Sequence, residues 1–327
     1  MTDPAGTQRH RPDAGGVVMS GSEPVMGWPH RHLLDVDQLT RAELERCLNL
    51  AVEMRERRSR RETLETLGGE VVGLAFCEPS TRTRVSFELA ATGLGAQVVN
   101  LPIEASSVTK GESLVDTLRT LERTGVGTIV LRHPMSGAPY LAARSTAARI
   151  VNAGDGTHAH PTQALVDALT LREALGSLEG KKIAIVGDIG HSRVARSNMH
   201  ALTALGALVR LAGPPAWVEG FDDWPGVTVV DHLEDALADA DAVMALRIQL
   251  ERAGGGGPSV REYRASWGLD EARMSLARPG APLLHPGPAN EGVEITADLA
   301  DSARSLIGTQ VANGVPVRMA VLSLLVR

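Results

Sequence analysis

The chain has 327 residues, of which 43% are hydrophobic and 22% are charged, which favours two α/β domains over a single core. The net charge of −6 and an aromatic content of 3% argue against nucleic acid as a partner. The two cysteines, Cys47 and Cys77, predict a reducing, cytoplasmic setting, and the lack of about 18 consecutive apolar residues predicts no membrane span.

Residues 1–29 are rich in Gly, Pro and Ser and lack the apolar segment of a secretory signal, so we expect a disordered tail there. Helical spacing follows in residues 33–60, where Thr40 and Glu43 form the pattern of a capping box. Short apolar runs then alternate with amphipathic segments. This predicts strands at 69–79, 96–103, 126–133 and 148–156, with helices at 80–95 and 113–125.

A long helix is predicted at residues 160–176, with an apolar stripe along one side. The strand, turn and helix pattern starts again in residues 181–215, and further strands are expected in 241–249 and 282–288. An apolar helix closes the chain at 314–327. The restart predicts an α/β fold with two doubly wound parallel-sheet domains joined by long helices, divided near residue 163.

The segment PSTRTR places Ser80, Thr81, Arg82 and Thr83 at the start of a predicted helix. A helix N-terminus has unpaired N–H groups and attracts anions, and the Arg guanidinium matches the oxygens of a phosphate. The simpler interpretation is a capped helix with solvated arginines. The strand before it and the several hydroxyls favour a phosphate site.

Polar side chains also follow the later strands of the first half. Arg132 ends one strand, where ligand-binding groups of open α/β sheets gather. His160 and Gln163 lie three residues apart on one helix face and could bind a carbonyl oxygen. His158 and His160 could be a metal pair, but no carboxylate or thiol stands at a matching spacing, so we predict no metal.

In the second half, Gly187 and Gly190 follow a strand but lack the third glycine and the acidic residue of a dinucleotide site. We therefore disfavour a nicotinamide enzyme. Arg193 at the next helix start suggests a carboxylate site, and Arg247 and Gln249 stand at a later strand end.

Two loops complete the set of candidate residues. Ser106 and Lys110 lie in a loop of small, polar residues, where a lysine is usually only solvated, and Gly287 and Pro288 lie in a stiff HPGP loop that offers carbonyl oxygens. The chain has no serine-hydrolase, zinc-protease or Walker motif. The candidates can stabilise charge but offer no covalent nucleophile.

Six segments, in order, resemble the aspartate carbamoyltransferase catalytic chain: PSTRTR, LRHPMSGAP, NAGDGTHAHPTQALVDALT, GDIGHSRVARSN, LHPGPANEGVEI and QVANGVPVRMAVL. The resemblance runs from about His32 to Arg327. It implies a carbamoyl phosphate-binding domain at 30–163, completed by a returning helix at 308–327, and an aspartate-binding domain at 164–307. It implies carbamoyl transfer to L-aspartate in pyrimidine biosynthesis, without metal or organic cofactor.

The resemblance also assigns roles to the candidate residues. The phosphate would be held by Ser80, Thr81, Arg82 and Thr83, and the carbamoyl group by Arg132, His160, Gln163 and the carbonyl groups of Gly287 and Pro288. Arg193 and Arg247 would bind the two aspartate carboxylates, assisted by Gln249. Ser106 and Lys110 would enter the site of a neighbouring subunit in a homotrimer, and the catalytic set would be Arg82, Thr83, Lys110, Arg132 and His160.

Two alternatives stay open. Ornithine carbamoyltransferases share STRTR, but an arginine in ALRIQ would repel the ornithine ammonium group. A non-catalytic scaffold is the other alternative, and the complete set of cations speaks against it. Glu291 and the glycine run at 254–257 depart from the family pattern, and we expect a looser aspartate-side loop. Whether regulatory or dihydroorotase subunits bind the trimer is left open.

Overall fold

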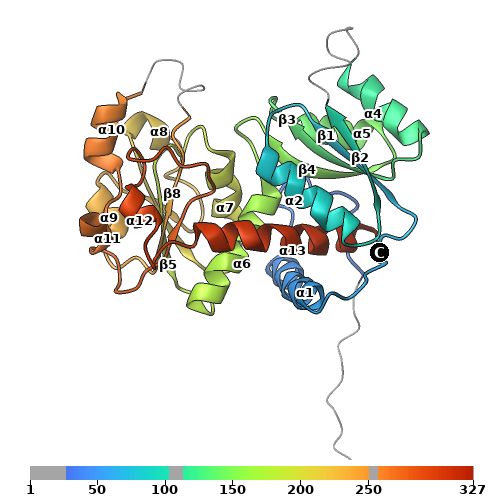
Figure 1. The fold of residues 1–327 in the computed structure, drawn as a ribbon. Helices are drawn as coiled ribbons and strands as arrows, with labels where there is room; N and C mark the ends of the chain where they lie inside the picture. The colour runs from blue at the N-terminus through green and yellow to red at the C-terminus, as the bar shows by residue number, and fades with distance from the viewer. Residues whose placement is uncertain (1–26, 103–112, 250–256, 327) are drawn as a thin grey trace, which may run out of the picture.

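The computed structural model describes residues 27–102, 113–249 and 257–326, so all but the last three residues of the predicted tail lie outside the described residues. The described chain forms two parallel β-sheets, each with helices on both faces (Figure 1). This arrangement confirms the predicted fold class of two α/β domains joined by long helices.

The first sheet has four parallel strands, in the order β2 (Gln97–Pro102), β1 (Val71–Phe76), β3 (Thr128–His133) and β4 (Arg149–Asp155). Side chains of β3 alternate between two helix layers. Ile129 and Leu131 join the apolar cluster of α4 (Leu114–Arg123) and α5 (Ala138–Ser145). Val130 points into the larger core on the other face. Burial on both faces explains why these strands are continuously apolar.

The second sheet has five parallel strands, in the order β7 (Val227–Val229), β6 (Leu208–Ala212), β5 (Lys182–Val186), β8 (Ala242–Ala245) and β9 (Leu283–Leu284). Ile183 and Ile185 pack into the larger core, whereas Ala184 and Val186 pack into the cluster beside α9 (Leu233–Leu237). The remaining helices of this domain are α7 (Arg193–Ala204), α8 (Pro215–Val218), α10 (Val260–Trp267), α11 (Glu271–Met274) and α12 (Ala297–Ala300).

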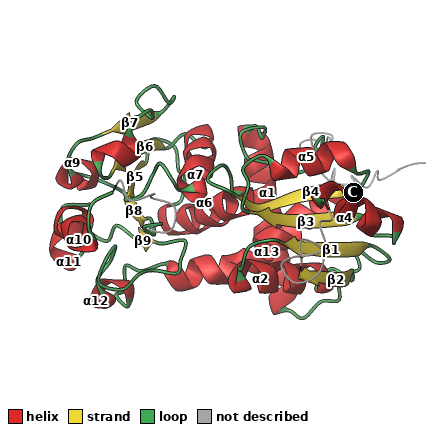
Figure 2. Ribbon diagram, turned by 90° about the horizontal axis from the view of Figure 1, so that it is seen from above, coloured by secondary structure: helices red, strands yellow, loops and turns green. Residues whose placement is uncertain are grey.

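Two long helices, α6 (Pro161–Leu175) and α13 (Ile307–Val326), join the domains (Figure 2). The helix α6 packs against β4, α7 and α13, and α13 packs against α1 (Arg41–Ser59) and α2 (Thr81–Thr92). A stripe was predicted along α6, but from Pro161 to Leu171 every residue except Gln163 is buried. The stripe was too narrow because packing from several sides cannot be inferred from one helix.

The C-terminal helix α13 is long and apolar enough to cross a membrane, yet 78% of its most apolar 18-residue segment is buried inside the fold. We therefore assign it as a core helix. It begins at Ile307, seven residues before the start at 314 that the apolar pattern predicts and one residue before the start at 308 that the resemblance implies. Gly314 and Pro316 are ordinarily unfavourable inside a helix, and both are buried here, so tertiary packing outweighs their low propensity.

Local signals at the start of the fold are confirmed. Thr40 caps α1, with Glu43 N donating to Thr40 Oγ1 at 3.3 Å and Thr40 N donating to Glu43 Oε2 at 2.8 Å. The sequence did not predict the short elements that lack a clear pattern, namely α5, α8, β7, α9, α10, α11 and α12. The parallel strands of each sheet present their carboxyl ends at one edge, where the ligand-binding groups of open α/β sheets usually lie.

Candidate active site

The first part of the site is the N-terminus of α2, directly after β1. Ser80 holds the N-cap position, but its side chain makes no capping hydrogen bond. Thr81 and Arg82 are exposed, whereas Thr83 is buried. A 12-residue helix whose first N–H groups are not capped by a side chain can accept an anion.

Arg82 lies against the main chain of Gly287, in the HPGP loop that follows β9. A Cβ atom built on Gly287, whose φ is +59°, would lie 2.7 Å from Arg82 Nη1, so a side chain there would displace the guanidinium, and the positive φ also favours glycine. Burial lowers the pKa of Arg82, and the positive charge of Arg247 lowers it further. The charge of a guanidinium from the second domain therefore acts on Arg82 beside this loop.

A second pair of arginines lies at the carboxyl end of β4. A Cβ atom on Gly154, with φ +115°, would lie 3.0 Å from Arg193 Cζ and 3.3 Å from Arg132 Nη1. Arg132 Nη1 donates to Ala153 O at 3.2 Å, and Arg193 Nη1 donates to Gly156 O at 3.3 Å. Arg132 is the last residue but one of β3 and Arg193 begins α7, so this pair also joins the two domains.

Glu78 lies between the two guanidiniums of this second pair. Its Oε2 accepts from Arg193 Nη1 at 2.9 Å and lies 3.5 Å from Arg132 Nε. Glu78 was not among the candidate residues predicted from the sequence. An acidic side chain two residues before the hydroxyls and guanidiniums of PSTRTR was the signal that could have identified it.

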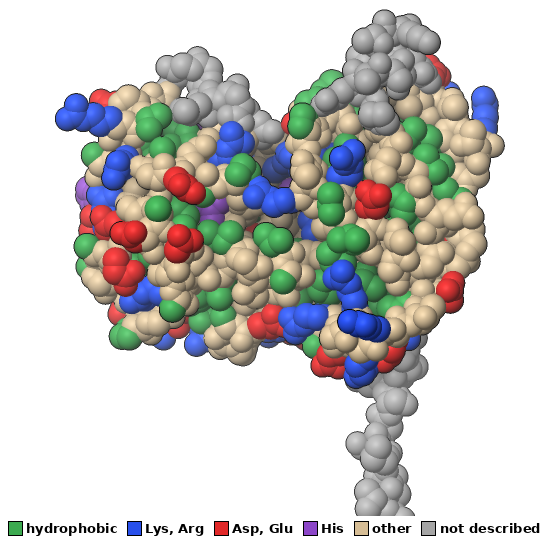
Figure 3. Space-filling view, viewed as in Figure 1, with side chains coloured by type: hydrophobic (Ala, Val, Ile, Leu, Met, Phe, Trp, Pro, Cys, Tyr) green, Lys and Arg blue, Asp and Glu red, His purple; other side chains and the backbone are tan. Residues whose placement is uncertain are grey.

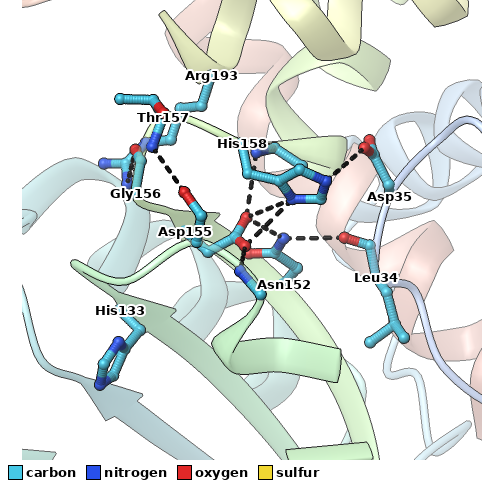
Figure 4. A network of polar contacts seen from close by, with 12 residues as sticks. Leu34, Asp35, His133, Asn152, Asp155, Gly156, Thr157, His158 and Arg193 are labelled. Atoms are coloured by element: carbon cyan, nitrogen blue, oxygen red, sulfur yellow. Dashed lines mark hydrogen bonds and ion pairs between the residues drawn. The ribbon is translucent and has the colours of Figure 1, made fainter. Parts of the chain in front are cut away.

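A buried polar network holds the loop after β4 in place (Figure 4). Asp155 accepts from Asn152 Nδ2 at 2.8 Å, from Ala159 N at 3.1 Å and from Gly137 N at 2.7 Å. His158 Nδ1 lies 3.2 Å from Asp155, which raises the pKa of that imidazole. The network positions the carbonyl groups that hold Arg132 and Arg193.

His160 is buried at the start of α6, and its main-chain N donates to Ser197 Oγ at 3.0 Å. Burial holds its pKa well below the usual value, and the charges of Arg132 and Arg193 lower it further. The imidazole is therefore neutral near pH 7. A neutral imidazole can donate one hydrogen bond, and Nδ1 has no hydrogen-bond partner among the described residues.

Hydrogen bonds hold the side chains of the two candidate glutamines in place. Gln163 Nε2 donates to Asp167 Oδ1 at 2.8 Å. Gln249 Nε2 donates to His191 O at 2.9 Å, and Gln249 N donates to Asp188 Oδ2 at 3.0 Å. These bonds fix the side chain of Gln163 at the start of α6 and that of Gln249 in the segment after β8.

The candidates Ser106 and Lys110 lie outside the described residues, and so do residues 254–256 of the glycine run. The other candidates are placed, and they come from both domains. Figure 3 shows the surface hollowed between the two lobes, with Lys and Arg side chains along the hollow. The arrangement can bind anions and stabilise negative charge that develops between them.

Asp35, Asp37 and His200 could hold a metal ion, since their ligand atoms lie within 4.8 Å of one another. Asp37 and His200 also line a cavity of about 390 Å³. None of the three is a candidate for substrate binding.

Comparison with protein families agrees with this arrangement. Residues 31–173 match the carbamoyl-P binding domain of aspartate/ornithine carbamoyltransferases, and residues 179–325 match their Asp/Orn binding domain. The chain belongs to the aspartate/ornithine carbamoyltransferase family. Membership in this family confirms the resemblance found in the sequence.

Similar curated members of the family are aspartate carbamoyltransferase catalytic subunits. The chain is 52% identical over 301 residues to the aspartate carbamoyltransferase catalytic subunit of Sorangium cellulosum, covering 91% of this chain and 94% of that one. It is 53% identical over 293 residues to the corresponding subunit of Thermus aquaticus, covering 89% and 97%.

Solved structures of the family share the fold. An aspartate transcarbamoylase from Trypanosoma cruzi, in complex with carbamoyl phosphate and aspartate, has a TM-score of 0.80 at 31% identity, covering 89% of this chain and 94% of that one. An ornithine carbamoyltransferase from Pyrococcus furiosus has a TM-score of 0.84 at 29% identity, covering 92% and 98%. The fold alone therefore does not separate aspartate from ornithine as the second substrate.

Proposed function

We propose that the chain transfers the carbamoyl group of carbamoyl phosphate to the amino group of L-aspartate, giving N-carbamoyl-L-aspartate and phosphate, a step of pyrimidine biosynthesis. The observation that carries the proposal is that two pairs of arginines each combine one residue from either domain. Arg132 and Arg193 both lie beside Gly154, and the charge of Arg247 lowers the pKa of Arg82. Two anionic substrates can be neutralised there together.

Aspartate fits this site better than ornithine because the second domain supplies two guanidiniums. Arg193 and Arg247 match the two carboxylates of aspartate, since each guanidinium can bind a carboxylate through two N–H groups. The ammonium group of ornithine would meet positive charge instead. The names of the curated relatives support the same choice.

The reaction follows from the inventory of side chains. The aspartate amine attacks the carbamoyl carbon, negative charge develops on the carbonyl oxygen, and the carbon–oxygen bond to phosphate breaks. We assign Arg132 and the neutral His160 to the carbonyl oxygen, and Ser80, Thr81, Arg82 and Thr83 to the phosphate. Each well-placed donor to such an oxyanion contributes about 3–4 kcal/mol. The departing phosphate takes the proton of the amine.

Phosphate release tests the assignment. Purified protein is given carbamoyl phosphate with either aspartate or ornithine, and we expect release with aspartate. Release with ornithine alone would reverse the choice of substrate. A scaffold without activity would show neither release nor a rise in melting temperature on adding carbamoyl phosphate, because a ligand stabilises only a protein that binds it.

We further propose a homotrimer in which Ser106 and Lys110 complete the site of a neighbouring subunit. The support is the position of these residues in the family motif. Inactive Lys110→Ala and Arg132→Ala chains, mixed as hybrid trimers, should regain part of the activity, because some sites then receive both native residues. Unmixed samples of each variant are the controls, and no recovery would argue against shared sites.

We propose that carbamoyl phosphate binds to the domain formed by residues 30–163 and 308–327, and that aspartate binds to the domain formed by residues 164–307.

We also propose that the protein acts in the cytoplasm. Cys47 is buried and Cys77 is half-buried, and both are free thiols, which supports a reducing compartment. Size measurement with and without co-expressed regulatory or dihydroorotase chains tests whether the proposed trimer has such partners.

A further inference from the structure

We propose that Asp167 is a positioning residue that makes the site selective for a carbamoyl group, with its N–H donors, over an acetyl group of the same shape. The inference rests on the proposed function. Asp167 lies on α6, one turn after Gln163, and is buried. Asp167 was not among the candidate residues predicted from the sequence.

The carboxylate of Asp167 accepts three hydrogen bonds from side-chain amides on three helices. Oδ1 accepts from Gln163 Nε2 at 2.8 Å and from Gln310 Nε2 at 2.7 Å, and Oδ2 accepts from Asn198 Nδ2 at 2.8 Å. An ionised carboxylate can only accept hydrogen bonds. Each amide must therefore turn its NH₂ group toward Asp167.

For Gln163 this bond decides which end of the amide faces the substrate. The NH₂ group is directed to Asp167, so the oxygen Oε1 is left to accept a hydrogen bond. Rotating the amide by half a turn would bring its oxygen against the carboxylate, which is unfavourable. Gln163 is thus kept as an acceptor, one turn along α6 from His160, at a site assigned to the carbamoyl group.

The amide of Gln310 connects Asp167 to the HPGP loop. Because Gln310 Nε2 donates to Asp167, its Oε1 is free to accept from His285 N, at 2.9 Å. His285 Nδ1 in turn accepts from Gly287 N at 2.8 Å. The loop is therefore attached, through Gln310, to the same carboxylate. Its Gly287 and Pro288 carbonyl groups are the other acceptors assigned to the carbamoyl amine.

Two sets of acceptors thus owe their orientation to one buried carboxylate. Acetyl phosphate has a methyl group where carbamoyl phosphate has NH₂, and it would leave these acceptors unpaired. Sites built to bind such N–H groups discriminate strongly against analogues that lack them. If Asp167 is replaced by Asn, the new NH₂ group can meet the oxygen of Gln163, and the amide can turn.

The test compares carbamoyl phosphate with acetyl phosphate in the full-length protein, with aspartate as acceptor. The measured quantity is the ratio of the competitive Ki of acetyl phosphate to the KM of carbamoyl phosphate. We expect this ratio to fall at least about tenfold in Asp167→Asn. Asp241→Asn is the matched control, since Asp241 is a buried carboxylate in the second domain that accepts from Lys182 N at 2.9 Å. Its ratio should not change.

A loss of activity in Asp167→Asn with an unchanged ratio would overturn the inference and leave Asp167 a purely structural role. Gln310→Leu keeps the bond between Asp167 and Gln163 but removes the link to His285, so its ratio should fall too. This second variant decides the question if Asp167→Asn does not fold. An inactive wild-type protein would contradict the proposed function, whereas an active one with unchanged ratios in the variants contradicts this inference alone.

Discussion

The two arginine pairs that join the domains differ in the charged groups that lie beside them among the described residues. At the end of β4, Glu78 lies between Arg132 and Arg193 and accepts from Arg193 at 2.9 Å. At the HPGP loop, Arg82 lies near Arg247, and the pKa of Arg82 is lowered by burial and by that neighbouring charge. His285, beside both, has its pKa lowered to about 4 by burial and the same two charges.

This difference suggests that the two pairs respond differently to a bound anion. The first pair is preorganised by a carboxylate of the protein, so its guanidiniums keep their positions before substrate arrives. The second pair is under mutual repulsion that a bound phosphate or carboxylate would relieve. Binding an anion should therefore change the energy of the second pair more than that of the first.

Replacing Arg82 should have the largest effect. Arg82→Ala removes a donor from the phosphate site, so kcat/KM for carbamoyl phosphate should fall by about 10²–10³-fold. The melting temperature without ligand should not fall, because the change also removes repulsion with Arg247. Arg58→Ala, on the exposed side of α1, is the control and should keep full activity. Lower ligand-free stability in Arg82→Ala would contradict the comparison.

Neutralising Glu78 should lower the stability of the ligand-free protein, because Glu78 lies beside the pair Arg132 and Arg193. Glu78→Gln leaves Arg132 and Arg193 without their shared carboxylate, and we expect a loss of about 3 kcal/mol in the free energy of unfolding without ligand. Urea unfolding measures it. Added carbamoyl phosphate should restore more stability in the variant than in the wild type. Equal stability of the two ligand-free proteins would show that Glu78 does not balance this pair.

The pH dependence of stability tests the environment of His285. Its pKa is lowered to about 4, so below pH 6.5 the unfolded chain binds a proton that the folded chain resists. Stability therefore falls as the pH drops from 6.5 to 4, and this group contributes about 2 kcal/mol of the loss at pH 5. His285→Asn keeps an acceptor for Gly287 N and cannot titrate. Its stability curve should be flatter, and a curve parallel to the wild type would refute the assignment.

The smallest effect is expected away from the site. Thr40→Ala removes the cap of α1 and should lower the free energy of unfolding by about 1 kcal/mol. Activity at saturating substrate should be unchanged. Thr40→Ser keeps the hydroxyl and is the matched control. A loss of activity would indicate that α1 contributes to the site, which the structure does not suggest.

Much of the fold was predictable because its signals are local. The apolar strands β1, β3 and β5, the capping box at Thr40 and the helix that starts at Pro161 each depend on residues close together in the chain. The early start of α13 could not be predicted from its own apolar pattern, since Gly314 and Pro316 are buried in a helix that packs against α1, α2 and α6.

For the site, the sequence alone selected the cations, hydroxyls and glutamines as candidates, because their residue types and spacing carry the family motifs. Only the tertiary structure decided which of them meet. Arg132 pairs with Arg193, and Glu78 lies between them, across a domain boundary that no periodicity reveals. The roles of Glu78 and Asp167 depend on charges and amides brought together from distant helices. Electrostatic and hydrogen-bond energies depend on distance in space, and distance along the chain does not report it.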